Sequence, residues 1–177
     1  MPRKRTLICA FADTHCGSPV GVMLPQTYQG KNGDIEPTET QKVLDEVVTA
    51  HLEKVNSLRQ PGDRLMVVHV GDACEGKHHG STETTTSLTS EHEGLHSAWM
   101  ARNLEYLNFG RKKDLLYYIA GTEAHGGSQN ESEHRIGKDL KAVPYRKGQA
   151  DGSGGWYAWS RLLVDINGVL LDYFAPV

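Results

Sequence analysis

Three short apolar segments, each followed at once by a polar cluster, constrain the fold of this chain more than any other feature. They lie at residues 6–12, 65–70 and 115–120. Apolar runs of this length, bounded by polar loops, are typical of buried β-strands. Segments in which apolar residues recur at helical spacing separate the three runs. The alternation of strands and helices predicts a layered α/β domain.

The other elements follow from caps, periodicity and turn residues. Thr38 is typical of a helix N-cap, and Asn167-Gly168 between two β-rich runs is a strong hairpin signal. The expected elements are a helix from Thr38 to Pro61, helices over 91–109 and 131–140, a long loop over 18–37, and a hairpin of 156–164 with 169–174.

Composition narrows the class of protein. The chain has 177 residues, with 22 acidic and 19 basic side chains and a formal net charge of -3. The length suits one domain, which we expect to span residues 1–177. The mild acidity argues against nucleic-acid binding driven by bulk charge. No apolar run approaches the ~20 residues of a membrane span, so we expect no membrane partner.

The cysteines and the first residues indicate a cytoplasmic protein. Three cysteines without close pairing do not form the framework of a secreted domain. The basic residues 1–5 precede the apolar segment 6–12, a pattern that signal peptides share. Asp13 and His15 follow this segment at once, which favours a buried strand instead.

The clusters after the strands carry side chains suited to metal chemistry. In an extended chain, Asp13 and His15 point to the same side, where both can bind one divalent cation. Asp72 can bridge two ions, and Glu75 can hold a ligand in place. His125 can protonate a leaving alkoxide. Each cluster alone is more often a cap or a turn. Because ligands collect beyond the carboxyl ends of such strands, the three clusters together are the main indication of function.

These residues resemble the calcineurin-like metallophosphoesterases. The family pattern is D-x-H, then G-D-x-x-[DE], then G-N-H-[DE]. Asp13-Thr14-His15 matches the first block, and Gly71-Asp72-Ala73-Cys74-Glu75 matches the second. The third position carries Gly121-Thr122-Glu123-Ala124-His125, which looks like a variant of phage and prophage members. The resemblance implies a metallophosphoesterase-like layered β-sandwich flanked by helices.

The resemblance also implies an activity. The chain would be a divalent-metal-dependent hydrolase of phosphate mono- or diesters, a phosphatase or a nuclease. Asp13, His15 and Asp72 would be metal ligands, Glu123 would replace the family's Asn, and His125 would be the catalytic histidine. Manganese, iron, nickel or zinc would be bound, two ions if the site is complete.

The family's later ligands, a lone His and G-H-x-H, have no match after the predicted hairpin. A shortened fold is therefore expected, in which His78, His79 or His134 could replace ligands. One alternative is a catalytically impaired protein with a binding or structural role. A partner chain or a homo-oligomer contact could complete the open sheet edge.

Two further features allow other interpretations. His92-Glu93-Gly94-Leu95-His96 matches H-E-x-x-H, in which His92 and His96 would bind zinc and Glu93 would act as general base of a metalloprotease. In the alternative interpretation, these residues form the polar face of a helix. Basic residues that could steer a nucleic-acid backbone towards the site lie at Arg135, Lys138, Lys141, Arg146 and Lys147.

Overall fold

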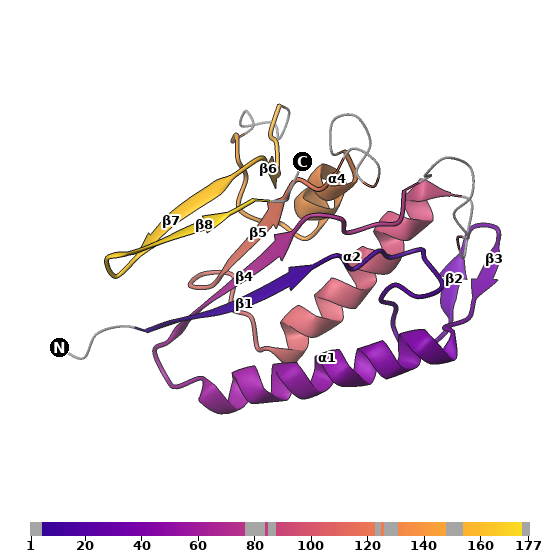
Figure 1. Ribbon diagram of the computed structural model, residues 1–177, viewed down its shortest axis with the longest axis horizontal. Helices are drawn as coiled ribbons and strands as arrows, with labels where there is room; N and C mark the ends of the chain where they lie inside the picture. The colour runs from indigo at the N-terminus through magenta and orange to yellow at the C-terminus, as the bar shows by residue number, and fades with distance from the viewer. Residues whose placement is uncertain are drawn as a thin grey trace.

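A parallel sheet forms the centre of the protein. The computed structural model describes residues 5–76, 84, 88–122, 125, 131–147 and 154–174. The strands are β1 (Thr6–Ala12), β4 (Arg64–Val70), β5 (Leu115–Ile119) and β6 (Ala158–Trp159). They lie in the order β1-β4-β5-β6, and every neighbouring pair is parallel (Figure 1). The predicted α/β class and its three apolar strands are confirmed.

Helices cover one face of this sheet. They are α1 (Glu39–Leu58), α2 (Thr89–Tyr106) and α4 (Glu131–Asp139). Val67 and Leu116 of the sheet share a core with Leu52 of α1, Trp99 of α2 and Ile136 of α4. Trp99 is fully buried, as the helical spacing predicts.

The predicted N-cap of α1 is confirmed as a capping box. The hydroxyl of Thr38 accepts a hydrogen bond from the amide of Gln41 at 3.2 Å, and Oε1 of Gln41 accepts one from the amide of Thr38 at 2.9 Å. Two amides that lack partners within the helix are thereby satisfied.

A β-hairpin covers part of the opposite face. It consists of β7 (Leu162–Ile166) and β8 (Val169–Tyr173), which pair antiparallel. Asn167 and Gly168 have φ of 56° and 86°, as a two-residue type I′ turn requires. Leu162 packs with Met66, Val68 and Ile119 of the sheet.

The hairpin prediction is therefore confirmed, except that the first run is not one strand. Ala158 and Trp159 pair with β5 in the parallel sheet, and the chain leaves that sheet at Ser160 before the hairpin begins.

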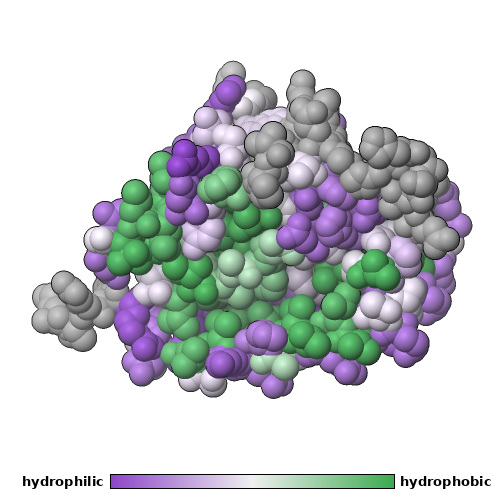
Figure 2. Space-filling view, in the orientation of Figure 1, coloured by the Kyte–Doolittle hydropathy of each residue, from purple (hydrophilic) through white to green (hydrophobic). Residues whose placement is uncertain are grey.

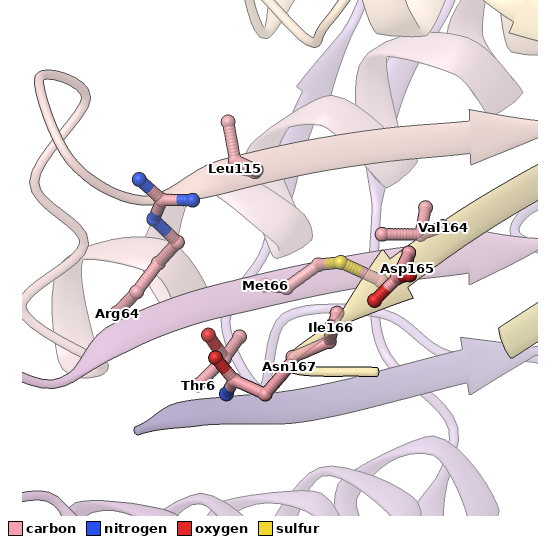
Figure 3. A pocket seen from close by; sticks show the side chains of 8 residues that line it. All are labelled: Thr6, Arg64, Met66, Leu115, Val164, Asp165, Ile166 and Asn167. Atoms are coloured by element: carbon pink, nitrogen blue, oxygen red, sulfur yellow. The ribbon is translucent and has the colours of Figure 1, made fainter. Parts of the chain in front are cut away.

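A small cavity of about 140 Å³ lies where the tip of the hairpin meets the sheet (Figure 3). Arg64 and Leu115, the first residues of β4 and β5, line it together with Asn167 of the turn. This cavity lies at the amino ends of the strands, whereas the polar clusters follow their carboxyl ends.

The segment 18–37 is not wholly a loop, contrary to the prediction. It contains two short antiparallel strands, β2 (Tyr28–Gly30) and β3 (Gly33–Ile35). Strands of three residues are too short to show an alternating pattern in the sequence. The amide of Lys31 in their turn donates a hydrogen bond to Glu91 Oε1 at 2.6 Å, which ties the pair to α2.

The surface carries apolar side chains at one side of the molecule (Figure 2). They belong to the edge strand β1, to α1 and to the hairpin, and include Ile8, Val47, Leu58, Leu163 and Leu170. None of the described helices is both long enough and apolar enough to cross a lipid bilayer.

Candidate metal centre

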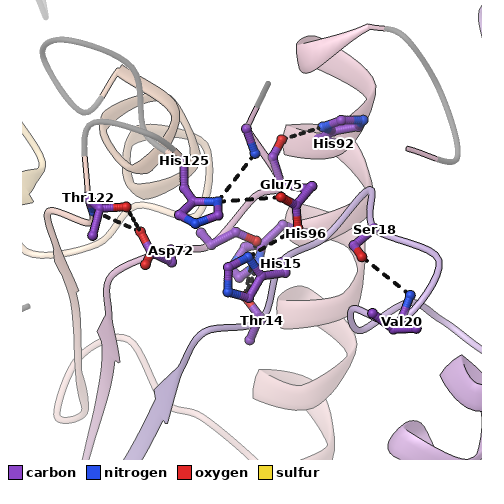
Figure 4. Close-up of polar contacts among 12 residues, drawn as sticks. Thr14, His15, Ser18, Val20, Asp72, Glu75, His92, His96, Thr122 and His125 are labelled. Carbon is purple, nitrogen blue, oxygen red and sulfur yellow. Dashed lines mark hydrogen bonds and ion pairs between the residues drawn. The ribbon is translucent and has the colours of Figure 1, made fainter. Parts of the chain in front are cut away.

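Three side chains from different parts of the sequence converge beyond the carboxyl ends of the parallel strands. His15 follows β1, Asp72 follows β4, and His125 follows β5. One ligand atom of each lies within 4.8 Å of the other two (Figure 4). Because adjacent parallel strands end at the same edge of a sheet, the loops that follow them are brought together. The structure therefore places three sequence-predicted residues in one group that could hold a metal ion.

Backbone hydrogen bonds join the loops after β1 and β4. The amide of His15 donates to the carbonyl of Asp72 at 3.1 Å, and the amide of Cys16 donates to the carbonyl of Ala73 at 3.0 Å. In the reverse direction, the amide of Glu75 donates to the carbonyl of Cys16 at 2.8 Å. The two loops thus continue the pairing of their strands, and this pairing fixes His15 beside Asp72.

Asp72 is oriented by the loop after β5. Its Oδ1 accepts hydrogen bonds from the amide of Thr122 at 2.8 Å and from the Thr122 hydroxyl at 3.0 Å. A Cβ atom at Gly121 would lie 2.4 Å from both the amide nitrogen and Oδ1 of Asp72. Only glycine permits this approach. Oδ1 is therefore held by the protein, and Oδ2 is the oxygen left for a cation.

Glu75 lies between the two histidines. Its Oε2 is 3.3 Å from Nδ1 of His15, and its Oε1 is 3.6 Å from Nδ1 of His125. Nδ1 of His125 also lies 3.5 Å from the amide nitrogen of Gly76. The two imidazole rings meet edge to face with their centroids 4.5 Å apart. The carboxylate of Glu75 therefore lies beside both imidazoles, and its predicted role of holding a ligand in place stays a prediction.

The donor set fits a transition-metal ion. Two imidazoles and one carboxylate are ligands that zinc, manganese, iron and nickel accept. Nδ1 of His15 is buried and makes no hydrogen bond in the part of the chain that the structure describes. A buried aromatic nitrogen in this state, beside the carboxylate of Glu75, is suited to a cation.

Asp13, in contrast, is not part of the group. Its side chain is exposed, and the prediction that Asp13 and His15 lie in extended chain is wrong. Both residues have left-handed backbones, with φ of 52° and 44°, because the chain turns sharply after β1. Glu123, His78 and His79 lie outside the described residues.

His134, another possible replacement ligand, has structural partners. Its ring stacks on Trp156 with centroids 4.1 Å apart, and its Nδ1 accepts a hydrogen bond from the amide of Tyr157 at 3.2 Å.

The H-E-x-x-H residues of α2 have separate partners. Nδ1 of His92 donates to the carbonyl of Glu75 at 2.9 Å. Glu93 accepts from Arg135 on α4, with a shortest contact of 2.7 Å. Nε2 of His96 lies 2.9 Å from the hydroxyl of Tyr118, and its Nδ1 lies 3.2 Å from the hydroxyl of Thr14. His92 and His96 are thus hydrogen-bonded within the protein, and among the described residues they join no group of potential metal ligands.

Sequence reasoning missed one acid beneath the centre. Glu133 of α4 is fully buried, and its Oε1 accepts a hydrogen bond from the amide of Ala73 at 3.3 Å. Burial, with a smaller contribution from Asp72, raises the pKa of Glu133. Ile136 and Leu140, three and seven residues further on, are also buried. The sequence signal for Glu133 is an acidic residue on the apolar face of a predicted helix.

Comparison of the chain with protein-family models, with curated proteins and with solved structures found no match.

Proposed function

We propose that this protein is a divalent-metal-dependent hydrolase of phosphate mono- or diesters. One observation carries the proposal: His15, Asp72 and His125 reach one point from three successive strand ends, with ligand atoms within 4.8 Å of one another. Chance clusters of exposed acids are common, but two of these side chains are imidazoles and Asp72 is buried. The resemblance of the first two blocks to the metallophosphoesterases supports the same reaction class.

His15, Asp72 and His125 are the proposed ligands. Thr122 holds one carboxylate oxygen of Asp72, which leaves the other to contact the ion. When bound, a divalent cation supplies Lewis-acid chemistry, because it lowers the pKa of water and polarises a phosphoryl oxygen. Hydrolysis breaks the bond from phosphorus to the leaving oxygen and forms one to the oxygen of water. The leaving oxygen takes up a proton.

We propose that His125 is a ligand rather than the proton donor, because its ring belongs to the group of potential ligand atoms. The same imidazole nitrogen cannot bind a cation and protonate a leaving group. His125→Ala separates the two roles. Loss of bound metal is expected for a ligand, whereas retained metal with lost turnover would identify a proton donor.

The layering supports a metallophosphoesterase-like fold. Helices pack on one face of the sheet, and the β7–β8 hairpin packs on the other. We propose that this hairpin belongs to the second sheet of such a sandwich.

Metal content and hydrolysis test the function together. Protein purified without chelator is expected to carry manganese, iron, nickel or zinc by elemental mass spectrometry, and to hydrolyse p-nitrophenyl phosphate or its bis ester. Asp72→Asn is expected to lose the metal and the activity. The loss of metal affinity should exceed the ~10–100-fold that follows removal of a residue that contacts a metal ligand but not the metal itself. His51→Ala is the matched control for His125→Ala, because His51 is an exposed histidine of α1 that contacts its own helix at Val47.

Two results would contradict the proposal. Wild-type protein that neither retains nor binds a transition metal would make the strand-end cluster a structural feature, and the search would turn to binding partners. Metal that survives Asp72→Asn but is lost in His92→Ala would place the metal at the H-E-x-x-H motif instead.

A further inference from the structure

A buried polar network lies directly beneath the candidate metal centre, and the chemistry proposed above does not use it. The hydroxyl of Thr14 is 2.9 Å from Nε2 of His69 and 3.2 Å from Nδ1 of His96, and it donates to the carbonyl of Ala73 at 3.0 Å. Nε2 of His96 lies 2.9 Å from the hydroxyl of Tyr118. Thr14 is 4% exposed, and the other three side chains are fully buried.

The donors and acceptors of this network are compatible with an arrangement of protons in which both imidazoles are neutral. A hydroxyl has one donor and two acceptor positions. When Thr14 donates to the carbonyl of Ala73, its oxygen can accept from both His69 and His96. Nδ1 of His96 also lies 3.5 Å from Sγ of Cys16. His96 then carries its proton on Nδ1, and its Nε2 accepts from Tyr118. Both imidazoles are neutral in this arrangement, which suits groups from which water is excluded.

The network connects the elements that carry the proposed ligands. Thr14 immediately precedes His15 in the loop after β1, and Ala73 immediately follows Asp72 in the loop after β4. His69 belongs to β4, His96 to α2 and Tyr118 to β5. One hydroxyl therefore ties the two loops to each other and to β4 and α2, and His96 extends the network to Tyr118 of β5.

We propose that Thr14 is a positioning residue of the metal centre, whose hydroxyl holds His15 and Asp72 at the separation that metal binding requires. The inference rests on the proposed function and names a residue that touches neither metal nor substrate. Its support is geometric: the hydroxyl is saturated and buried, and the backbones on either side of it are left-handed. Nearby water does not replace a hydrogen bond that is lost at a site so deeply buried.

The test is a titration of metal-free protein with CoCl₂, followed by visible absorbance, on wild type, Thr14→Val and Thr14→Ser. Valine keeps the shape of threonine without the hydroxyl, and serine keeps the hydroxyl. Thr14→Val is expected to raise the dissociation constant for Co²⁺ by about tenfold or more. Thr14→Ser is expected to restore it to within about threefold of wild type.

A second threonine separates positioning from general stability. Thr38→Val removes the cap hydroxyl of α1, which bonds Gln41 and the carbonyl of Pro19. This variant is expected to unfold at lower urea concentration and to bind Co²⁺ as wild type does. If Thr14→Val does not fold, Tyr118→Phe removes only the far end of the network and is expected to weaken Co²⁺ binding by a few-fold.

Each outcome decides between the claims. Wild type that does not bind Co²⁺ overturns the proposed function and this inference with it. If wild type binds Co²⁺ and folded Thr14→Val binds it with the same affinity, the inference alone is overturned. If Thr14→Val does not fold, unchanged Co²⁺ affinity in Tyr118→Phe has the same consequence. If Thr14→Val weakens Co²⁺ binding and Thr14→Ser weakens it equally, the effect comes from packing, and the inference is overturned.

Discussion

Asp13, His15 and Asp72 have backbone conformations that most L-amino acids avoid. Their φ angles are 52°, 44° and 51°. Aspartate and histidine tolerate this region better than β-branched residues do, yet each instance still costs about 1–3 kcal/mol. The hydrogen bonds between the loops after β1 and β4 hold these conformations in place. Left-handed residues gathered at a cluster of ionisable groups are typical of a functional site, because strain of this kind persists only where the surroundings enforce it.

The close approach of Gly121 to Asp72 gives a prediction about a single substitution. Gly121→Ala places a Cβ 2.4 Å from the amide nitrogen and Oδ1 of Asp72, so the carboxylate must move. We expect a loss of about 1–3 kcal/mol in the free energy of unfolding. The affinity for Co²⁺ should fall at least about tenfold, which a CoCl₂ titration measures.

Gly110→Ala is the control for this substitution. Its Cβ would meet the nearest atom, in the side chain of Lys113, at an ordinary 3.5 Å. Metal binding should therefore be unchanged. Equal Co²⁺ affinity in Gly121→Ala and wild type would show that the position of Asp72 is not critical for the centre.

The sequence was informative about residues that stand directly after strands and uninformative about their partners. His15, Asp72 and His125 were predicted because each follows an apolar run. Thr14 and Glu133 were not, because their roles depend on neighbours far away in the chain: His96 for Thr14, and Ala73 for Glu133. A hydrogen bond between residues 82 positions apart leaves no pattern in the sequence itself.

At the scale of elements, long periodic segments were predicted well and short ones were not. The predicted first strand, 6–12, matches β1 to the residue. α1 begins after its predicted cap and ends three residues before Pro61. β6 has two residues and β2 has three, so neither is long enough to display a period. Their place is decided by the partners that the fold provides.

Among the described residues, the H-E-x-x-H side chains of α2 join no group of potential metal ligands, which gives a prediction about Glu93. Its carboxylate accepts from Arg135 and from the hydroxyl of Ser132, and so joins α2 to α4. Glu93→Gln should lower the free energy of unfolding by about 1 kcal/mol, because Arg135 is half-exposed and its ion pair is screened by water. Metal content and phosphoesterase activity should stay as in wild type.

Urea denaturation and elemental mass spectrometry check this expectation. In a zincin, Glu93 would be the general base, and its loss would abolish hydrolysis while zinc remained bound. Peptidase activity that wild type shows and Glu93→Gln lacks, with zinc retained in both, would therefore support the protease interpretation. Arg135→Gln removes the other partner of the ion pair and should produce a stability loss of similar size.

At the scale of the whole molecule, the sheet is covered by helices on one face and by the hairpin on the other. His69 and His96 lie on the helical side, where their rings meet edge to face at 4.8 Å. Burial lowers the pKa of His96 to about 3, and burial with a contribution from His96 lowers the pKa of His69 well below its usual range. Both histidines are inside the core, so their protonation is linked to global unfolding.

This linkage predicts how stability depends on pH. The unfolded chain binds a proton at His96 below about pH 6.5, whereas the folded protein excludes it until about pH 3. The unfolded state binds more protons within this window, so the free energy of unfolding is highest above the window and falls as the pH is lowered through it. Between pH 6 and pH 5 each buried histidine should contribute a loss of about 1 kcal/mol.

Urea denaturation of wild type and His96→Gln at pH 7, 6 and 5 measures this dependence. His96→Gln should be less stable than wild type at pH 7, because the neutral network is broken, yet lose about 1 kcal/mol less between pH 6 and pH 5. His51→Gln, at an exposed position of α1, should keep the wild-type slope. Equal slopes in His96→Gln and wild type would mean that His96 binds its proton in the folded protein. The network would then have to open between pH 6 and pH 5 to admit this proton.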